Sequence, residues 1–381
     1  MLVLIDADPI VYRCGFAAEK TSWHIIYSTP TSEAEEILFS SDENGTAGYY
    51  MKEWTKFNEG KVTILDKSRK IIPDPLSYAL RAVKVQVESI MEECEVHHKE
   101  SGKMLMYLSG RGGSFRDKIA KVRPYKGNRD PTHKPYHYDA IRDYLRAQYG
   151  SLMTSGIEAD DAVSIFAHNH YERGTPERLV IATIDKDLDQ IPGHHYNYMH
   201  KVHYAITPAE AERFFVYQIL AGDPTDNVIG VWRCGETAAN KIASQFSYHR
   251  RILSDAELAA GSNLLHSGAA KPEQHVSTAN RADVATAEQL AQSEFRPDDA
   301  ESANTQPSYG NTNVRAPSWW PTVIAEYAAS RRKAGCPYAQ DNPETIAVEM
   351  AQLLKLQEYP GMLWHPYGNL VVEGFGQEDF D

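Results

Sequence analysis

Cysteine is scarce in this chain, with four residues in 381. Because Cys14, Cys94, Cys234 and Cys336 are far apart and form no CxxC pair, the sequence excludes a zinc knuckle and a disulfide framework, and we expect reduced thiols. Long apolar runs are also missing. No run approaches the roughly 20 apolar residues that span a bilayer, and the initial LVLI meets Asp6 too soon for a signal peptide. These absences predict a cytoplasmic protein without a membrane segment.

Positive charge is in deficit, and the formal net charge of -13 argues against general nucleic-acid binding. The segment 111–134 is the exception, because it carries eight Lys or Arg against two Asp. That local excess predicts a surface that faces phosphate groups. Aromatic residues are nearly absent from 251–317, where only Phe295 and Tyr309 occur. A segment that buries so little predicts a low-complexity insertion or linker.

Acidic residues are plentiful, and nine of them form four short clusters. Three clusters lie where a buried apolar run ends, and acids at strand ends converge on one crevice, where protonation or bound cations must relieve their repulsion. An acidic helix start or a plain acidic loop is the alternative for each cluster taken alone. The clusters are Asp6 and Asp8 after LVLI; Glu158, Asp160 and Asp161 in GIEADDAVS; Asp185 and Asp187 after LVIAT; and Asp223 and Asp226 in GDPTDN.

Together the clusters predict a divalent-metal site. Mg²⁺ prefers carboxylate and water oxygens, and two ions about 4 Å apart stabilise both the attacking and the leaving oxygen in phosphodiester cleavage. Seven to nine acids exceed the need of one ion, so two ions are expected. The histidine pairs His168 with His170 and His194 with His195 would suit zinc or manganese. We interpret these pairs as solvated surface.

The order of buried runs predicts an α/β fold with a mainly parallel central sheet flanked by helices. The expected strands are 2–5, 104–108 and 179–183, within an α/β core over 1–205. The β-rich runs WHIIYS, GYYM, KVTILD and RKIIP predict hairpins inserted at about 20–75. A loop or arch is expected at about 109–150, a linker at 251–317, and a helical extension over 318–381 that packs back on the core.

GDPTDNVIGVWRCGETAANKI, residues 222–242, predicts two helices joined by a glycine-rich turn. With Gly230 and Gly235 in that turn, the pattern resembles a helix-hairpin-helix over 206–250, whose backbone N–H groups hold a phosphate without reading bases. An ordinary helical hairpin with a glycine cap is the alternative.

Five motifs in order carry a family resemblance: LIDADPIVYR, SFRDKIAKVRPYKGNRD, GIEADDAV, IATIDKDLDQIP and GDPTDNVIGVWRCGETAA. Over 1–16 and 104–246 the chain resembles the 5′-nuclease (flap endonuclease) superfamily, most of all the 5′→3′ exonucleases of tailed phages. The resemblance implies a helical arch over the active site and a helix-3-turn-helix element that grips DNA. It also implies a monomeric, phage-encoded enzyme that uses two Mg²⁺ ions, with Mn²⁺ as a substitute, on duplex or flap DNA with 5′ ends.

The same resemblance implies a role for each matched residue. Lys126 and Arg129 would contact the scissile phosphate, Tyr125 would stack on the terminal base, and Arg116 would contact a phosphate. One metal ion would be held by Asp6, Glu158, Asp160 and Asp161, and the second would be supported by Asp185, Asp187, Asp223 and Asp226.

Two departures from the family pattern stand out. Ser109 occupies the position of a usual aspartate after the second strand, so one metal ligand is missing. We expect Asp8 to compensate, directly or through water, because it lies two residues beyond Asp6. Arg233 stands where many relatives have glycine, which leaves a K⁺ site at the hairpin open.

Several activities fit these residues. Sequence does not decide between a 5′→3′ exonuclease and a flap endonuclease, or between DNA and an RNA–DNA hybrid as in RNase H-like cleavage. Loss of the Ser109 ligand would suit a catalytically weakened, structure-specific DNA-binding protein. A phosphatase with Asp6 as nucleophile and Asp8 as acid is a further alternative, but it leaves YKGNR and GDPTDN unexplained.

Overall fold

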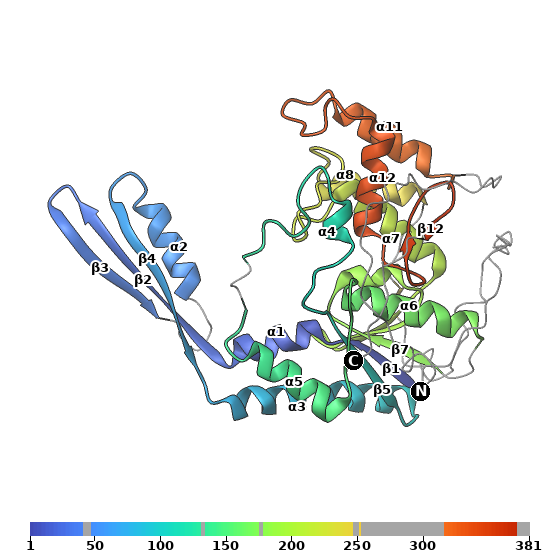
Figure 1. The fold of residues 1–381 in the computed structure, drawn as a ribbon, viewed down its shortest axis with the longest axis horizontal. Coiled ribbons are helices and arrows are strands. Elements are labelled where there is room, and N and C mark those ends of the chain that lie inside the picture. Colours follow the sequence, from blue (N-terminus) through green and yellow to red (C-terminus); the bar gives the residue numbers. More distant parts are fainter. Residues whose placement is uncertain (41–46, 131–133, 175–177, 247–250, 253–315, 372–381) are drawn as a thin grey trace, which may run out of the picture.

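A computed structural model describes residues 1–40, 47–130, 134–174, 178–246, 251–252 and 316–371. Almost all of the predicted linker at 251–317 therefore lies outside the described residues. The core is a seven-stranded sheet with the order β10-β9-β8-β7-β1-β5-β6 (Figure 1). Its strands are β1 (Leu2–Asp6), β5 (Lys103–Leu108), β6 (Leu152–Met153), β7 (Leu179–Ala182), β8 (Gly193–Asn197), β9 (Val202–Ile206) and β10 (Arg251–Ile252).

The sheet is mainly parallel, as predicted. β1 pairs in parallel with both β5 and β7, and β6 and β8 extend the parallel part on either side. Only β9 and β10 pair antiparallel. β1 is central because Val3, Leu4 and Ile5 are fully buried, which leaves neither face of the strand in contact with solvent.

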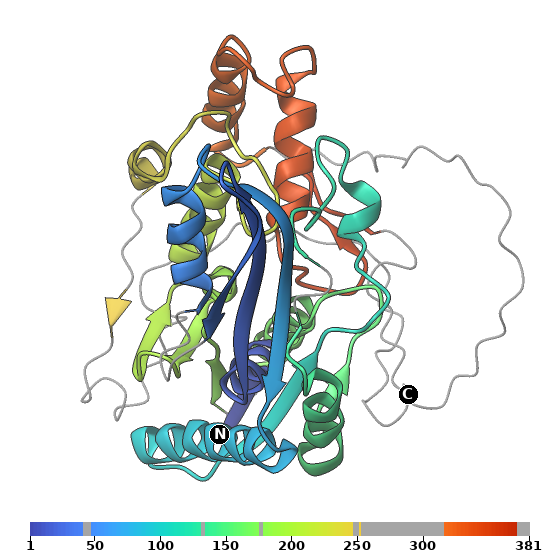
Figure 2. The same ribbon diagram turned by 90° about the vertical axis from the view of Figure 1, so that its left-hand side faces the viewer.

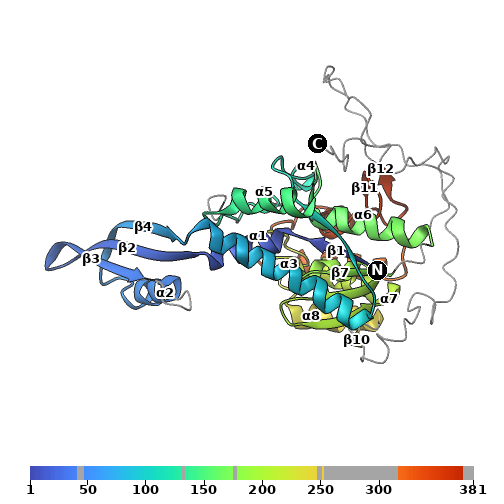
Figure 3. The same cartoon turned by 90° about the horizontal axis from the view of Figure 1, so that it is seen from below.

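Helices cover both faces of this sheet. Val3 and Ile5 point to one face, where α1 (Asp8–Ala17), α3 (Leu76–His98) and α5 (Tyr138–Tyr149) contact one another (Figure 3). Leu4 points to the other face, which packs against α6 (Ala159–Glu172). The strict alternation along β1 therefore places one helix layer on each side.

An arm is inserted between α1 and α3 and projects away from the core (Figures 1 and 2). It consists of β2 (Glu19–Thr29), β3 (Ser32–Ser40) and β4 (Thr63–Pro73), with β2 in the middle, and helix α2 (Ala47–Phe57). The prediction of a strand at GYYM was wrong, because these residues lie in α2. Met51, Trp54 and Thr55 recur at helical spacing toward the strands.

The predicted arch at 109–150 contains little helix before α5. Among the described residues of 109–137 the one helix is α4 (Arg116–Ile119), which turns follow, and α5 begins at Tyr138. Proline explains the difference: Pro124 and Pro135 each lack an N–H and interrupt helical hydrogen bonding.

The C-terminal part packs on α7 (Pro208–Ala221) and α8 (Glu236–Ala243). It comprises α11 (Trp320–Ser330), α12 (Pro343–Leu354), β11 (Met362–Leu363) and β12 (Leu370–Val371). Its anchor is aromatic: Trp319 and Trp364 stack with centroids 5.9 Å apart, and Phe215 of α7 lies 5.4 Å from Trp364. Among the helices that the structure describes, none combines the length and apolarity that a bilayer crossing demands.

Histidines gather where α3 ends against β8 and β9. His97 stacks on His203 at 3.8 Å, and His98 lies 5.8 Å from His194. Buried ring nitrogens of His98, His194 and His203 have no hydrogen-bond partner, and Arg178 donates to His98. The interpretation of His194 and His195 as solvated was wrong, since His195 is fully buried. Burial lowers the pKa of His98 and of His194 to about 4, and that of His203 to about 3.

These histidines predict acid sensitivity of the fold. A folded pKa below the unfolded value of about 6.5 gives stability that is complete above pH 6.5 and is lost as pH falls toward the folded pKa. His203 alone should then cost about 2 kcal/mol between pH 7 and pH 5. We expect His203→Phe to reduce the pH dependence of the free energy of unfolding by about this amount, measured by urea titration. His200→Phe is the control, because His200 is exposed; an equal change in both variants contradicts the account.

Candidate functional site

The four acid clusters meet at one edge of the sheet. Asp6 ends β1, and Asp185 follows β7 and caps η1 (Lys186–Gln190), which contains Asp187. The parallel neighbours β1 and β7 end at the same edge, which brings these carboxylates together. Glu158, Asp160 and Asp161 begin α6, and Asp223 and Asp226 lie in 222–235 between α7 and α8.

Five basic side chains pair with five of the nine acids. Three of them, Arg116, Lys126 and Arg129, come from the part of the arch before α5, whereas Arg142 and Lys186 belong to α5 and η1. The pairs are Arg142 with Asp8 (3.1 Å), Arg116 with Asp161 (2.5 Å) and with Glu158 (3.3 Å), Lys126 with Glu158, Arg129 with Asp226, and Lys186 with Asp223 (3.8 Å). Sequence reasoning missed both Arg142 and Lys186. Lys186 lies between Asp185 and Asp187 in the sequence, which is a local signal, whereas Arg142 lies in α5 and is 134 residues from its partner Asp8.

The other four acids, Asp6, Asp160, Asp185 and Asp187, form no ion pair with a described residue. Burial, and then repulsion from neighbouring carboxylates, raises the pKa of each of them. The pKa of Asp187 rises to about 8. Nine carboxylates against five cations leave a formal charge of −4, which equals the charge that two divalent cations would neutralise.

Arg116 does not face a phosphate, contrary to its predicted role. Its side chain is 2% exposed, and all five of its N–H groups have acceptors inside the protein. It binds both oxygens of Asp161, one oxygen of Glu158, and the carbonyls of Leu353 and Lys355. Arg116 is thus a buried link between the arch, α6 and the C-terminal end of α12.

Asp161 is the main partner of Arg116. It is fully buried, and its oxygens accept from Arg116 and from the backbone N–H groups of Glu158 and Gln357. Its predicted role as a metal ligand is therefore replaced by a structural one, because no side-chain oxygen is left facing the other acids.

Tyr125 is not exposed for stacking on a base. Its ring is buried, and its hydroxyl lies 2.7 Å from both Glu158 and Asp226. Burial and the neighbouring Glu158 raise the pKa of the phenol well above its usual range, so it remains a donor. Tyr125, itself part of the arch, therefore bridges two acid clusters.

Lys126 and Arg129 lie directly on the acids, as their predicted place near the site requires. Lys126 binds Glu158, and its backbone N–H donates to the carbonyl of Asp226 at 2.9 Å. Arg129 binds Asp226 and the carbonyl of Thr225. Their contact with a phosphate stays a prediction.

Asp8 and Ser109 have other partners than those expected. One oxygen of Asp8 accepts from Arg142 and the other from the backbone N–H of Ser109, each at 3.1 Å. The hydroxyl of Ser109 accepts from the N–H of Ala159 at 2.9 Å, in the first turn of α6. Ser109 thus satisfies a free N–H at the start of the helix that carries Asp160.

The turn between α7 and α8 depends on close backbone contact. A Cβ on Gly230 would lie 2.3 Å from the nitrogen of Gly222, and Gly230 has φ of +63°. Gly235 is the N-cap of α8, and Arg233 has φ of +57°. The geometry suits a helix-hairpin-helix, but the DNA contacts of Gly230 and Gly235 stay predictions.

Carboxylate oxygens with an unneutralised charge of −4 suit hard divalent cations. Among the described residues, however, no three His, Cys, Asp or Glu side chains are arranged to hold a metal ion. Two of the acids already have basic partners, since Lys126 binds Glu158 and Arg129 binds Asp226. The donor set fits a hard cation by the chemistry of its oxygens, and cation binding at Glu158 or Asp226 would separate these ion pairs.

Several known proteins are similar to this chain over part of its length. No protein-family model matches the chain. The thermostable DNA polymerase I of Thermus thermophilus is 30% identical over 160 residues, which are 39% of this chain and 19% of the polymerase. The 5′-3′ exonuclease of Buchnera aphidicola is 27% identical over 172 residues, 42% of this chain and 59% of the exonuclease.

The exonuclease of Escherichia phage T7 is 28% identical over 125 residues, 32% of this chain and 41% of the phage protein. A structure of T5 5′-exonuclease with zinc aligns over 43% of this chain and 67% of its own, with 19% identity and a TM-score of 0.34. The chain spans about a fifth of the polymerases that it matches. The sequence relatives confirm the resemblance to the 5′-nuclease superfamily.

The Asp8–Arg142 pair predicts a coupled loss of activity. If Asp8 acts by holding Arg142 and Ser109, Asp8→Ala and Arg142→Met should each lower metal-dependent DNA cleavage, and the double variant should be no worse than the more impaired single variant. Rates on a labelled DNA duplex with Mg²⁺ provide the measurement. Additive losses, with Arg142→Met near wild type, would instead return Asp8 to the role of a metal ligand.

Proposed function

We propose that this chain, a relative of the 5′-nuclease superfamily, is a divalent-metal-dependent nuclease that hydrolyses DNA from 5′ ends, as a 5′→3′ exonuclease or flap endonuclease. The observation that carries the proposal is the set of four carboxylates at the sheet edge without a basic partner among the described residues: Asp6, which is buried, and Asp160, Asp185 and Asp187, which are half-buried. Relatives named as exonucleases support it.

Two Mg²⁺ ions, with Mn²⁺ as a substitute, are the proposed cofactors. Bound divalent ions lower the pKa of a water and stabilise the attacking and leaving oxygens of a phosphodiester. The first would be held by Asp6, Glu158 and Asp160, and the second by Asp185, Asp187, Asp223 and Asp226. Asp161 is not among these ligands, because Arg116 holds both its oxygens.

Lys126 and Arg129 would then act on the substrate. In the structure Lys126 forms an ion pair with Glu158, and Arg129 forms one with Asp226. If Glu158 and Asp226 bound cations instead, Lys126 and Arg129 would be available for an incoming phosphate and would stabilise the charge that develops on it. Tyr125 would keep Glu158 and Asp226 in position through its hydroxyl.

The DNA would be gripped away from the cut bond. The N-terminus of α8 at Gly235 and the turn at Gly230 offer backbone N–H groups to a phosphate, as in a helix-3-turn-helix element. Exposed cations of the arch, such as Lys121 and Arg123, would add phosphate contacts. We propose a monomer that works on duplex or flap DNA in phage DNA replication or degradation, in the cytoplasm of the host.

A nuclease assay tests the proposal. We incubate the chain with Mg²⁺ and 5′-labelled duplex, nicked, flapped and RNA–DNA hybrid substrates. Release of mononucleotides would indicate an exonuclease, and cuts at the junction a flap endonuclease. We expect Asp185→Ala to reduce the rate at least a hundredfold, because it removes a carboxylate from the proposed second metal site.

Asp66→Ala is the matched control, since Asp66 is exposed on the arm, and its rate should equal wild type. Preferred cleavage of the hybrid would redirect the proposal to an RNase. If no substrate is cleaved with either metal while DNA still binds, the chain is the catalytically weakened DNA-binding protein instead.

A further inference from the structure

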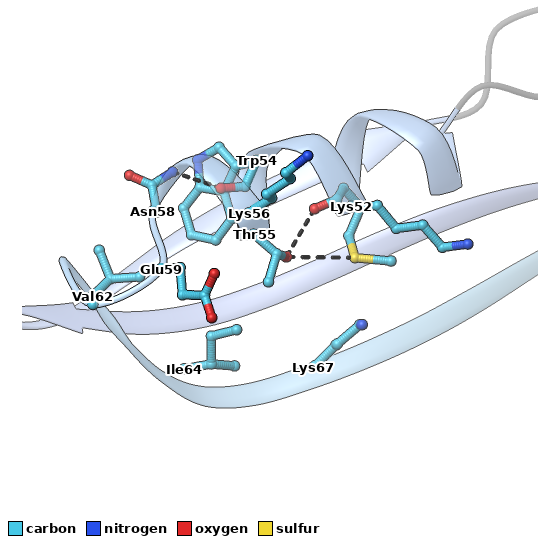
Figure 4. A pocket seen from close by; sticks show the side chains of 11 residues that line it. Lys52, Trp54, Thr55, Lys56, Asn58, Glu59, Val62, Ile64 and Lys67 are labelled. Atoms are coloured by element: carbon cyan, nitrogen blue, oxygen red, sulfur yellow. Dashed lines mark hydrogen bonds between the residues drawn. The ribbon is translucent and has the colours of Figure 1, made fainter. Parts of the chain in front are cut away.

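The arm carries unpaired positive charge that the nuclease site does not use. Lys52 and Lys56 of α2, Lys61 after it and Lys67 of β4 are exposed, and none forms an ion pair with another described residue. Lys52, Lys56 and Lys67 line a pocket of about 520 Å³ between α2 and β4, together with Trp54 and Glu59 (Figure 4). Glu53 and Glu59 are exposed beside these lysines, so the cluster keeps an excess of two positive charges, which suits an anionic partner.

Aromatic rings lie among these lysines. Phe57 is 73% exposed, Tyr49 62% and Tyr50 54%, and all three are on α2. Tyr49, Lys52 and Lys56 are spaced by three and four residues and share one face of the helix, and Tyr50 and Phe57 share the adjacent face. Lys61 lies 4.0 Å from the centre of the Phe57 ring.

The helix is held rigidly on the strands, so these side chains form a fixed surface. Trp54 packs edge-on against Tyr27 at 4.9 Å, and Phe39 lies 6.0 Å away on β3. Met51 is buried beneath α2, and Thr55 and Asn58 bond back to helix carbonyls. The exposed rings and lysines therefore take no part in holding α2 on the strands.

We propose that this surface, α2 with Lys61 and Lys67, binds the single-stranded part of a DNA substrate. Lysines supply phosphate contacts, and exposed rings stack on unpaired bases without selecting a sequence. The class of nucleic acid rests on the proposed function. A duplex has no unpaired base faces, so it would leave Tyr49, Tyr50 and Phe57 without a role.

The position of the arm fits this use. α1 begins at Asp8 beside the acids, and its ten residues carry the chain about 15 Å to the arm. α2 lies on the side of the arm that faces α4 and α8 (Figure 1). The strands β2 and β4 have eleven residues each and extend about 36 Å.

Binding of a fluorescent dT20 oligonucleotide to the full chain tests the proposal, by anisotropy in EDTA so that no metal site is involved. We expect Lys52→Ala/Lys56→Ala to weaken binding about tenfold and to reduce the slope of log affinity against log salt by about 1.4, which corresponds to two phosphate contacts on a single strand. Phe57→Ala should weaken binding about fivefold or more, through lost stacking.

Lys84→Ala/Lys103→Ala is the matched control, because both lysines are exposed on other elements, and it should bind like wild type. Unchanged binding of dT20 by the arm variants overturns the proposal. Equal weakening for a blunt duplex, with no effect of Phe57→Ala, would overturn the single-strand assignment, and loss of self-association in sedimentation would make α2 a protein contact instead.

A cleavage experiment separates this proposal from the proposed nuclease function. On a duplex with a 20-nucleotide single-stranded tail, the lysine double variant should raise KM about tenfold and leave kcat unchanged, whereas a blunt duplex should show neither change. Absence of cleavage by wild type contradicts the nuclease but leaves the dT20 result standing. Equal KM values on the tailed duplex contradict the arm proposal alone.

Discussion

The buried ion pair between Arg116 and Asp161 holds the site together. A guanidinium out of water is costly unless each donor is satisfied, and Arg116 meets that condition with two carboxylates and two backbone carbonyls. Because its partners come from α6 and from the C-terminal end of α12, the pair fixes the start of α6 against the arch and the C-terminal part. Arg116 depends on the Leu353 and Lys355 carbonyls for two of its hydrogen bonds.

Because α6 is fixed, the carboxylates that form no ion pair cannot move apart to relieve their repulsion. Asp6 is buried and Asp160, Asp185 and Asp187 are half-buried, and desolvation together with repulsion from neighbouring carboxylates raises the pKa of each. The arch neutralises two neighbouring acids, because Lys126 pairs with Glu158 and Arg129 with Asp226. The same two cations that stabilise the acids in the structure are those proposed to meet the phosphate, so cation binding and substrate binding are linked through the arch.

Sequence predicted the elements whose signal is local. The buried runs of β1, β5 and β7 and the acids at their ends follow from hydrophobic pattern and strand position, and the parallel sheet follows from their order. The partners of Arg116, Tyr125 and Asp8 did not, because each lies more than thirty residues away in sequence and a family motif names a residue without its burial. α2 was missed because GYYM alternates too briefly to distinguish a strand from a helix.

Calorimetric titration with Mg²⁺ at pH 7, in two buffers of different ionisation enthalpy, tests the central claim most directly. If the four unpaired carboxylates form the cation site, about two ions should bind per chain and release at least one proton, since Asp187, with a pKa of about 8, must ionise to bind. Asp187→Asn should remove most of that release. Binding of two ions without proton release, or no binding at millimolar Mg²⁺, would contradict the account.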